Sequence, residues 1–325
     1  MRAVRNRLRR IAGAAALVTG LAGILIRLTV QDSFLASGIV FYATPWPVLA
    51  CLLAAGARGI AGAAPGTSRR RLGRAALLAA AAAAVISVAT GWSMHRCVQS
   101  GRPVRVLFWN CAHGRFGWES IAAEIRATDA DLIGLVEAGP RTPVRERFWR
   151  RRFPEYTIWL PGREIVLMVR GDIETARAHD LEGRGDAAAA RVRLRGEPVL
   201  AVVADLHSSP VMRRDLPMQK LGRLMEGPSD RPRILMGDFN TPSDTAHMTA
   251  VRRAVHPAFD LGGTGWRPTW PVPLPVLDLD QIWVSEAIEP SCVRTRWTRL
   301  SDHAQVLAEI RLPAREIPSV SSVQD

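Results

Sequence analysis

Three stretches without a charged side chain occupy most of the first 92 residues, and they restrict what this part of the chain can fold into. They are residues 11–26, 38–57 and 75–92. About 20 apolar residues cross the core of a bilayer, and the first stretch reaches this length if Arg27 snorkels to the interface. We therefore predict that residues 1–95 form a membrane anchor with three transmembrane helices, at about 11–30, 38–57 and 75–92.

Two other interpretations of these stretches stay open. An arginine-rich start followed by an apolar run has the form of a cleaved signal peptide. The alanine-rich third stretch has the form of a helix buried in a protein core. Pro45 and Pro47 are expected to kink the second span without preventing it.

The placement of arginine predicts the orientation of the spans. Five arginines precede the first span and five lie between the second and the third, whereas the loop between the first two contains only Asp32 as a charged residue. Because basic loops stay in the cytoplasm, the N-terminus and the second loop are expected there. Everything after about residue 93 is then expected outside the cytoplasm.

The charge distribution argues against a nucleic-acid partner. The 325 residues carry a formal net charge of +13. Residues 1–100 hold 12 arginines and one acid, whereas the rest of the chain holds 31 basic and 29 acidic residues. A domain that follows a phosphate backbone needs a basic surface, so we expect no nucleic-acid partner. We interpret the basic run at residues 69–71 as a contact with anionic lipid headgroups.

Residues 103–312 are long enough to fold as one domain with its own core. Short apolar runs at 104–109, 132–136, 199–204, 234–236, 282–284 and 304–310 alternate with helical segments at 118–127, 215–225 and 244–255. This alternation predicts an α/β fold. Residues 183–190 are predicted to form a hairpin-type loop, and residues 313–325 a disordered tail.

Polar side chains stand at the ends of these apolar runs. They are Asn110, Glu137, His207, Asp238, Asn240, Asp280, Asp302 and His303. Asp238 and Asn240 lie two residues apart and point the same way if the strand continues, since side chains of a strand alternate between its faces. Oxygen ligands suit Mg²⁺ or Mn²⁺, and histidines beside carboxylates suit proton transfer at a phosphate ester. Each residue alone has another interpretation. Asp-Phe-Asn is equally compatible with a turn, Glu137 alone is more often a solvated strand end, and His207 or His303 alone is more often a hydrogen-bonded imidazole. The prediction therefore rests on their combination.

With these residues in this order, the chain resembles the endonuclease/exonuclease/phosphatase superfamily over about residues 103–312. The Gly-Asp-Phe-Asn segment ending at Asn240 and the Ser-Asp-His segment ending at His303 match its motifs. The resemblance implies a four-layer α/β sandwich, in which two mixed sheets pack face to face with helices outside. It also implies hydrolysis of phosphate esters with Mg²⁺ or Mn²⁺ as cofactor.

The resemblance further implies a role for each site residue. The implied metal ligands are Glu137, Asn110 and Asp302. The implied catalytic residues are His207, Asp238, Asn240, Asp280 and His303, of which Asp280 orients His303. The implied contacts to the substrate phosphate are Asn110, His207 and Asn240. Ala112 stands where some members carry another acid, which argues against a second full metal site.

The other histidines have no comparable context, and we expect them to be structural or solvated. They are His95, His113, His179, His247 and His256. The loop at 262–275, which contains Trp266 and Trp270, either faces the substrate, as in many members of the superfamily, or is a packed surface loop. Of the four cysteines, Cys51 lies within a span; we expect Cys97, Cys111 and Cys292 to be free buried thiols.

Together these expectations predict a multi-pass protein of a bacterial cell membrane with an extracytoplasmic phosphoesterase domain. Tethering raises the effective concentration only of membrane-bound targets, which favours a lipid-linked phosphate of the cell envelope as substrate. The layout also resembles that of bacterial membrane proteins of glycopeptide (teicoplanin) resistance. The alternatives are an exported nuclease, a phosphodiesterase like phospholipase or sphingomyelinase, and a non-catalytic binding module.

Overall fold

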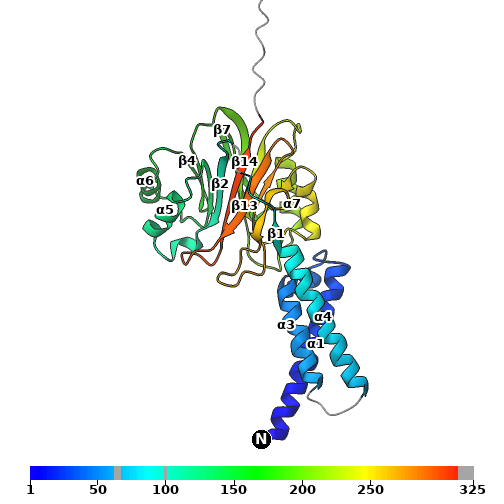
Figure 1. The fold of residues 1–325 in the computed structure, drawn as a ribbon. Coiled ribbons are helices and arrows are strands. Elements are labelled where there is room, and N and C mark those ends of the chain that lie inside the picture. Colours follow the sequence, from blue (N-terminus) through cyan, green and yellow to red (C-terminus); the bar gives the residue numbers. More distant parts are fainter. Residues whose placement is uncertain (62–66, 99–100, 314–325) are drawn as a thin grey trace, which may run out of the picture.

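The structure of the protein is a computed structural model that describes residues 1–61, 67–98 and 101–313. A bundle of helices formed by the residues up to Gly91 stands against one end of a β-sandwich formed by the rest of the described chain (Figure 1). Of the tail expected at 313–325, residues 314–325 lie outside the described residues.

The sandwich contains two six-stranded sheets. The first has the order β13, β14, β2, β3, β5 and β4, which are Glu289–Arg296, Gln305–Arg311, Val104–Asn110, Leu132–Val136, Ile165–Val169 and Thr157–Gly162. The second has the order β10, β12, β9, β8, β7 and β6, which are His256–Pro257, Asp280–Val284, Arg233–Asp238, Glu197–Leu206, Gly185–Leu194 and Ile173–Asp180. Both sheets are mixed, because β2 pairs in parallel with β3, and β8 with β9, whereas the remaining pairs are antiparallel.

Apolar side chains fill the space between the sheets and cover both outer faces. Along β2, Val106 and Phe108 face the layer between the sheets, whereas Leu107 and Trp109 face the helices outside, as expected from the alternation of strand side chains. The first sheet is covered by α5 (Trp118–Arg126) and α6 (Pro143–Arg152), and the second by α7 (Asp215–Leu224) and α8 (Thr249–Arg252). The predicted α/β fold, with mixed sheets flanked by helices, is confirmed.

One predicted helix, at residues 244–255, is wrong as a single element. It consists of the 3₁₀ turn η2 (Ala246–Met248) and the four-residue α8. Two contacts are made where this helix was expected to begin: the backbone N–H of the preceding residue, Ser243, donates to Asp278 at 3.3 Å, and the carboxylate of Asp244 pairs with Arg27 at 3.3 Å. The short helices η1 (Ala112–Gly114) and α9 (Ala258–Gly262) complete this part of the fold.

The bundle contains α1 (Arg2–Leu28), α3 (Trp46–Ala61) and α4 (Thr67–Gly91), which lie side by side in Figure 1. They pack around a small apolar cluster that includes Leu49 and Leu53 of α3. Helices α1 and α3 approach so closely that a Cβ atom on Gly13 would lie 2.6 Å from the Cα atom of Gly59. Such contacts between small residues are typical of helices packed in membranes.

The expected middle span at residues 38–57 is wrong as one continuous helix. The chain instead forms α2 (Leu35–Ala43) and α3, which are bent by 78° relative to each other. Pro45 and Pro47 lack an N–H donor, and a residue before proline avoids the helical region; Thr44 accordingly has φ −124° and ψ 57°. Within the described residues, α1 and α4 contain stretches long and apolar enough to cross a membrane, Val4–Leu28 and Arg70–Gly91, and a third crossing results if α2 and α3 count as one span.

The bundle is attached to the sandwich by polar contacts of two buried residues, Arg27 and Asp32. Arg27, expected to snorkel toward lipid headgroups, is instead buried and pairs with Asp244 of the sandwich. Asp32 is also buried; its carboxylate accepts the backbone N–H of Ala246 at 3.0 Å, and its carbonyl oxygen lies 3.0 Å from His247 Nε2. The end of α1 and the segment after it are therefore fixed to the sandwich.

A second attachment follows α4. Strand β1 (Trp92–Met94) pairs with β11 (Thr264–Trp266), and Cys97 forms a disulfide with Cys292 of β13. The expectation of free thiols is wrong for these two cysteines, because their proximity depends on a pairing between residues 195 positions apart. Cys111 is free and buried, as expected.

Candidate active site

The pairing of the strands brings the predicted site residues to one edge of the sandwich. The parallel strands β2 and β3 end side by side, so that Asn110 lies next to the end of β3, which Glu137 follows. Strand β12 runs antiparallel to β9, with Asp280 opposite Asp238. Strand β14 runs antiparallel to β2, and therefore His303, which precedes β14, returns to the end of β2.

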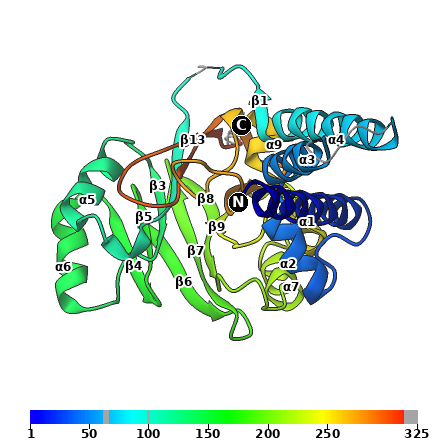
Figure 2. The ribbon, with the colours of Figure 1, turned by 90° about the horizontal axis from the view of Figure 1, so that it is seen from below.

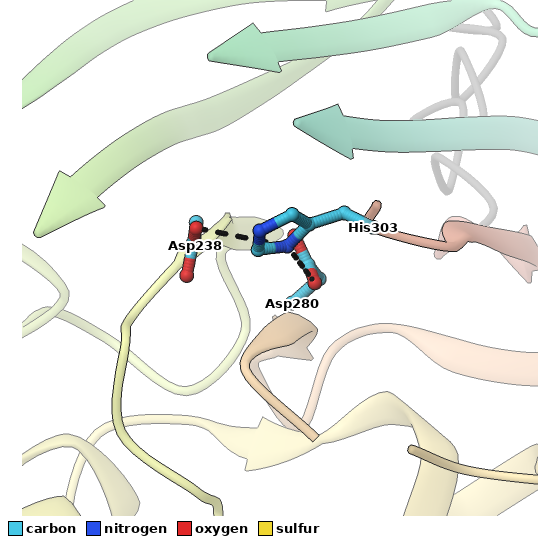
Figure 3. Close-up of side chains that lie close together, drawn as sticks. All are labelled: Asp238, Asp280 and His303. Carbon is cyan, nitrogen blue, oxygen red and sulfur yellow. Dashed lines mark hydrogen bonds and ion pairs between the residues drawn. The ribbon is translucent and has the colours of Figure 1, made fainter. Parts of the chain in front are cut away.

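Two carboxylates and an imidazole form the buried centre of this edge (Figure 3). The Nδ1 atom of His303 lies 2.8 Å from Oδ2 of Asp280 and 3.8 Å from Oδ2 of Asp238. The side chains of both acids are at most 1% exposed and that of His303 is 9% exposed. Because Asp280 engages Nδ1, it fixes the orientation of the ring and leaves Nε2 as the nitrogen that can meet a ligand.

Two asparagines hold the carboxylate of Asp238 in place. Asn110 donates from its side-chain amide to Oδ2 at 3.0 Å, and Asn240 donates its backbone N–H to Oδ1 at 2.9 Å. Asn240 has a positive φ of 46°, a conformation that asparagine tolerates better than most residues. Its side-chain amide donates to the carbonyl oxygen of Leu206 at 2.7 Å. Asn110 is fully buried, so its hydrogen bond to Asp238 lies in the interior of the protein.

The glycine before Asp238 permits a close approach of two strands. A Cβ atom on Gly237 would lie 2.5 Å from the carbonyl oxygen of Ala204 in β8, which no side chain tolerates. The Gly-Asp-Phe-Asn segment is thus required by packing at its first position and by hydrogen bonding at its second and fourth.

Burial and charge separate the pKa values of the central groups. Burial, together with repulsion from Asp280, raises the pKa of Asp238 to about 6. Burial would lower the pKa of His303, but Asp280 and Asp238 outweigh it and raise this pKa to about 10. At neutral pH, His303 therefore carries a proton that it can donate, and Asp238 is the group able to accept one.

A third acidic group, Asp205, lies opposite Asp238 in the pairing of β8 with β9. Burial and the charge of Asp238 raise the pKa of Asp205 well above its ordinary value. Burial in this position therefore favours the uncharged form of the Asp205 carboxyl group.

Glu137 belongs to a more exposed group on the same edge. It has a positive φ of 48°, and its Oε2 atom lies 3.1 Å from Nε2 of His113. The other ring nitrogen of His113 lies 2.7 Å from Oε2 of Glu164. The imidazole of His113 therefore bridges two carboxylates. The sequence predicted a structural or solvated His113; its position three residues after Asn110 is the signal that relates it to the site.

A cavity of about 590 Å³ lies against both the buried Asp238 and His303 and the more exposed Glu137 and His113. It is lined by five of the predicted site residues, which are Glu137, Asp238, Asn240, Asp302 and His303. Trp270 forms part of the wall; its indole N–H donates to Asp302 at 3.4 Å, and its ring centroid lies 6.5 Å from that of His303. The loop at 262–275 therefore faces the cavity through Trp270.

The structure does not bring His207 into this arrangement. Its side chain is exposed, and its Nδ1 atom accepts the backbone N–H of Ser209 at 3.0 Å. The adjacent Ser208 lines the cavity, whereas His207 is not among the described residues that do so. Its role in acid catalysis stays a prediction, as does metal binding by Asn110, whose side-chain oxygen accepts the N–H of Ala112 at 2.9 Å.

The donor atoms around the cavity fit a hard divalent cation. The ligand atoms of Asp238, Asp280 and His303 lie within 4.8 Å of one another, but hydrogen bonds already join His303 to Asp280 and Asn110 to Asp238. Carboxylates of Glu137 and Asp302 line the cavity. Mg²⁺ typically binds through one or two carboxylates and keeps waters and substrate phosphate as its other ligands, which this arrangement can provide.

Comparisons with known proteins agree with the motifs. The sequence model of the endonuclease/exonuclease/phosphatase family matches residues 107–303. No curated protein matches the sequence significantly.

Solved structures of low sequence identity share the fold of the sandwich. An endonuclease/exonuclease/phosphatase from Bacteroides vulgatus is 17% identical with a TM-score of 0.55, and covers 65% of this chain and 100% of its own. A mannosyl-6-phosphatase from Bacteroides thetaiotaomicron is 15% identical with a TM-score of 0.52, and covers 64% and 100%. D. rerio TDP2 in complex with a single-strand DNA product is 14% identical with a TM-score of 0.53, and covers 65% and 100%. At these identities the likeness concerns the fold alone.

Proposed function

Because the chain belongs to the endonuclease/exonuclease/phosphatase family, we propose that it is a membrane-anchored, divalent-metal-dependent phosphoesterase. We further propose that it acts outside the cytoplasm on a lipid-linked phosphate of the bacterial cell envelope. The observation that carries this proposal is the cavity in which the buried Asp238, Asp280 and His303 meet the carboxylates of Glu137 and Asp302. Its domains would be the anchor at 1–95 and the enzyme at 103–312.

Glu137 and Asp302 are the proposed ligands of Mg²⁺ or Mn²⁺, with Asn110 supporting the site. The bound ion would supply positive charge that polarises the phosphate and stabilises the charge developing on its oxygens. Trp270 would hold Asp302 toward the cavity through its indole N–H. The imidazole of His113 would likewise hold the carboxylate of Glu137 in place through its Nε2 atom.

Proton transfer is assigned to the buried groups. Asp238, fixed by Asn110 and Asn240, would orient the attacking water and accept its proton. His303, which is protonated at neutral pH, would donate from Nε2 to a phosphate oxygen, and Asp280 would keep the ring in this orientation. Asn240 would contact the phosphate, and His207 would protonate the leaving oxygen after a movement of its loop.

Three observations support a location on the outer face of the membrane. Helices α1 and α4 are long and apolar enough to cross a bilayer. Ten arginines precede the first span or lie between the second and third, which favours a cytoplasmic position for both segments. The disulfide between Cys97 and Cys292 belongs to a part of the chain that would then be exported, and disulfides persist in oxidising compartments.

The layout of spans followed by an exported phosphoesterase domain resembles the teicoplanin-resistance membrane protein VanJ. We therefore propose that turnover of the lipid-linked phosphate underlies glycopeptide tolerance. Expression of the whole chain in a sensitive bacterium should raise its tolerance of teicoplanin, and a His303→Ala variant should not. Equal protection by both would mean that the protein acts by binding.

A hydrolysis panel on the full-length protein in nanodiscs tests the substrate class. The panel contains undecaprenyl pyrophosphate, phosphatidic acid, sphingomyelin, mannose 6-phosphate, and single- and double-stranded DNA. We expect turnover of a lipid phosphate that stops when EDTA removes the metal and is absent in Glu137→Gln. Cleavage of DNA without turnover of any lipid would assign the protein to the nuclease alternative, and turnover of sphingomyelin alone would assign it to the phosphodiesterase alternative.

A further inference from the structure

Helix α2 of the anchor forms part of the wall of the candidate active site. Ile39, Tyr42 and Ala43 line the same cavity of about 590 Å³ as Asp238 and His303. Segments about two hundred residues or more apart in the sequence therefore share one cavity. The anchor contributes directly to the surface that a substrate meets.

Hydrogen bonds fix this wall in place. The hydroxyl of Tyr42 donates to Oδ2 of Asp32 at 2.8 Å, and the Oδ1 atom of Asp32 accepts the backbone N–H of Ala246 in the sandwich. At the end of α2, Arg27 donates to the carbonyl oxygen of Phe41 at 2.8 Å while it pairs with Asp244. Helix α2 is thus bound to both the bundle and the sandwich, and does not behave as part of a flexible tether.

The outer side of α2 is apolar and continues the surface of the membrane helices. Phe34, Leu35 and Ile39 are 66%, 55% and 41% exposed. Leu25 and Leu28 at the end of α1 are 63% and 70% exposed. Figure 1 shows that the bundle meets one end of the sandwich, and Figure 2 shows α2 between α1 and α7. Ile39 both lines the cavity and is exposed on this apolar side.

We propose that α2 is the wall of the cavity that determines substrate specificity. The lipid substrate enters the cavity from the bilayer, past the apolar side of α2. The hydrocarbon chain of the lipid phosphate lies along Ile39, while its phosphate reaches Asp238 and His303. An apolar chain that stays in contact with lipid and with Ile39 avoids exposure to water during the reaction. This inference rests on the proposed function and adds to it the element that distinguishes a lipid-linked phosphate from a soluble one.

Matched pairs of long-chain and short-chain phosphates test the inference in the full-length protein reconstituted in nanodiscs. The pairs are undecaprenyl with isopentenyl pyrophosphate, and dioleoyl phosphatidic acid with glycerol 3-phosphate. The measured quantity is the ratio of kcat/KM for the long chain to kcat/KM for the short chain. A charge at Ile39 meets the hydrocarbon chain, so Ile39→Glu should lower this ratio about tenfold or more. Ile39→Ala should also lower this ratio, by a smaller factor, and it introduces no charge that could disturb folding.

Leu35→Glu is the matched control, since Leu35 is on the same helix and exposed but does not belong to the lining of the cavity. It should lower the ratio less than Ile39→Glu does, because its side chain does not meet the hydrocarbon chain inside the cavity. Equal losses in the Ile39 and Leu35 variants, or no loss in either Ile39 variant, would overturn the inference while the proposed function stands. A wild-type protein that hydrolyses only the short-chain phosphates would instead overturn the proposed function.

Discussion

At the scale of single residues, the chemistry of the site depends on which group carries a proton. Asp280 lies against Nδ1 of His303, and its charge is the main reason why the imidazole stays protonated at neutral pH. Asp238 is buried beside the same carboxylate, which raises its pKa to about 6. Asp280 therefore keeps the proton donor charged and, together with burial, raises the pKa of the proton acceptor.

These pKa values predict a bell-shaped pH profile of kcat/KM. Activity should rise as Asp238 loses its proton near pH 6, and fall as His303 loses its proton near pH 10. Asp280→Asn removes the charge that stabilises the imidazolium, so the alkaline limb should move to lower pH, and activity at neutral pH should fall less than in His303→Ala. The profile is measured at saturating Mg²⁺. An alkaline limb that stays in place in Asp280→Asn would contradict the assignment of the proton to His303.

Glu137 is expected to hold the metal. Glu137→Gln keeps the size of the side chain but removes its charge, so activity should fall by about a hundredfold or more and recover in part at high Mg²⁺ concentration. Glu164→Gln is the control, because Glu164 contacts the same His113. The loss of activity in this variant should be smaller and should not depend on the Mg²⁺ concentration. Unchanged turnover in Glu137→Gln, measured across a Mg²⁺ titration, would reject this ligand.

The motifs made part of the site predictable from sequence. Asp238 ends one apolar run and His303 precedes another. The pairing of their strands brings both residues to a shared edge, as expected. The contacts of His113 and Tyr42 were not predictable. His113 is in a turn with a positive φ of 53°, and Tyr42 reaches the cavity through packing of the anchor on the sandwich; neither leaves a periodic signal in the sequence.

At the scale of elements, the sequence predicted six strands whose apolar runs adjoin candidate site residues, which are β2, β3, β8, β9, β12 and β14. Strand β5 was missed, although all five of its residues are buried. Strand β6 was missed because its side chains are mostly exposed and include charged residues, as in IETARAHD. Strand β7 contains Ala187–Ala190, predicted as part of a loop; its pairing with β6 and β8 overrides the low β-propensity of alanine. The break between α2 and α3 exceeds the expected kink because two prolines lie within three residues.

The disulfide that attaches the segment after β1 to β13 predicts a measurable stabilisation. Cys97→Ser should lower the free energy of unfolding by about 2–4 kcal/mol, since the bond closes a long loop of the unfolded chain. A reducing agent should lower the Tm of the wild-type protein but leave that of Cys97→Ser unchanged. Cys51→Ser, which changes a free and exposed cysteine, is the control. A Tm insensitive to reduction in every variant would show that these two cysteines are not bonded in solution.

At the scale of the whole molecule, the sequence predicted an apolar N-terminal region and a separate α/β fold, but not how they meet. Arg27 was expected to snorkel to the membrane interface and Asp32 to lie in the loop between the first two spans, whereas both are buried and contact the sandwich. Contacts between segments more than 200 residues apart carry no local signal. The orientation of the molecule in the membrane stays a prediction.

A reporter fusion checks this orientation. Alkaline phosphatase attached after Asp325 should be active, because it folds only outside the cytoplasm, and a reporter that works only in the cytosol should be silent at the same position. The same two reporters attached within residues 58–74, which contain five arginines, should give the opposite result. Activity of the cytosolic reporter after Asp325 would remove the argument for an envelope substrate.

The most direct test of the account is the release of phosphate from undecaprenyl pyrophosphate by the full-length protein in nanodiscs as Mg²⁺ is titrated. The account predicts turnover that depends on Mg²⁺, is abolished by EDTA, and is lost in His303→Ala while that variant keeps its Tm. Turnover that persists in EDTA or in His303→Ala would contradict the proposed site, and no turnover by the wild-type protein at any Mg²⁺ concentration, together with cleavage of DNA, would contradict the proposed substrate.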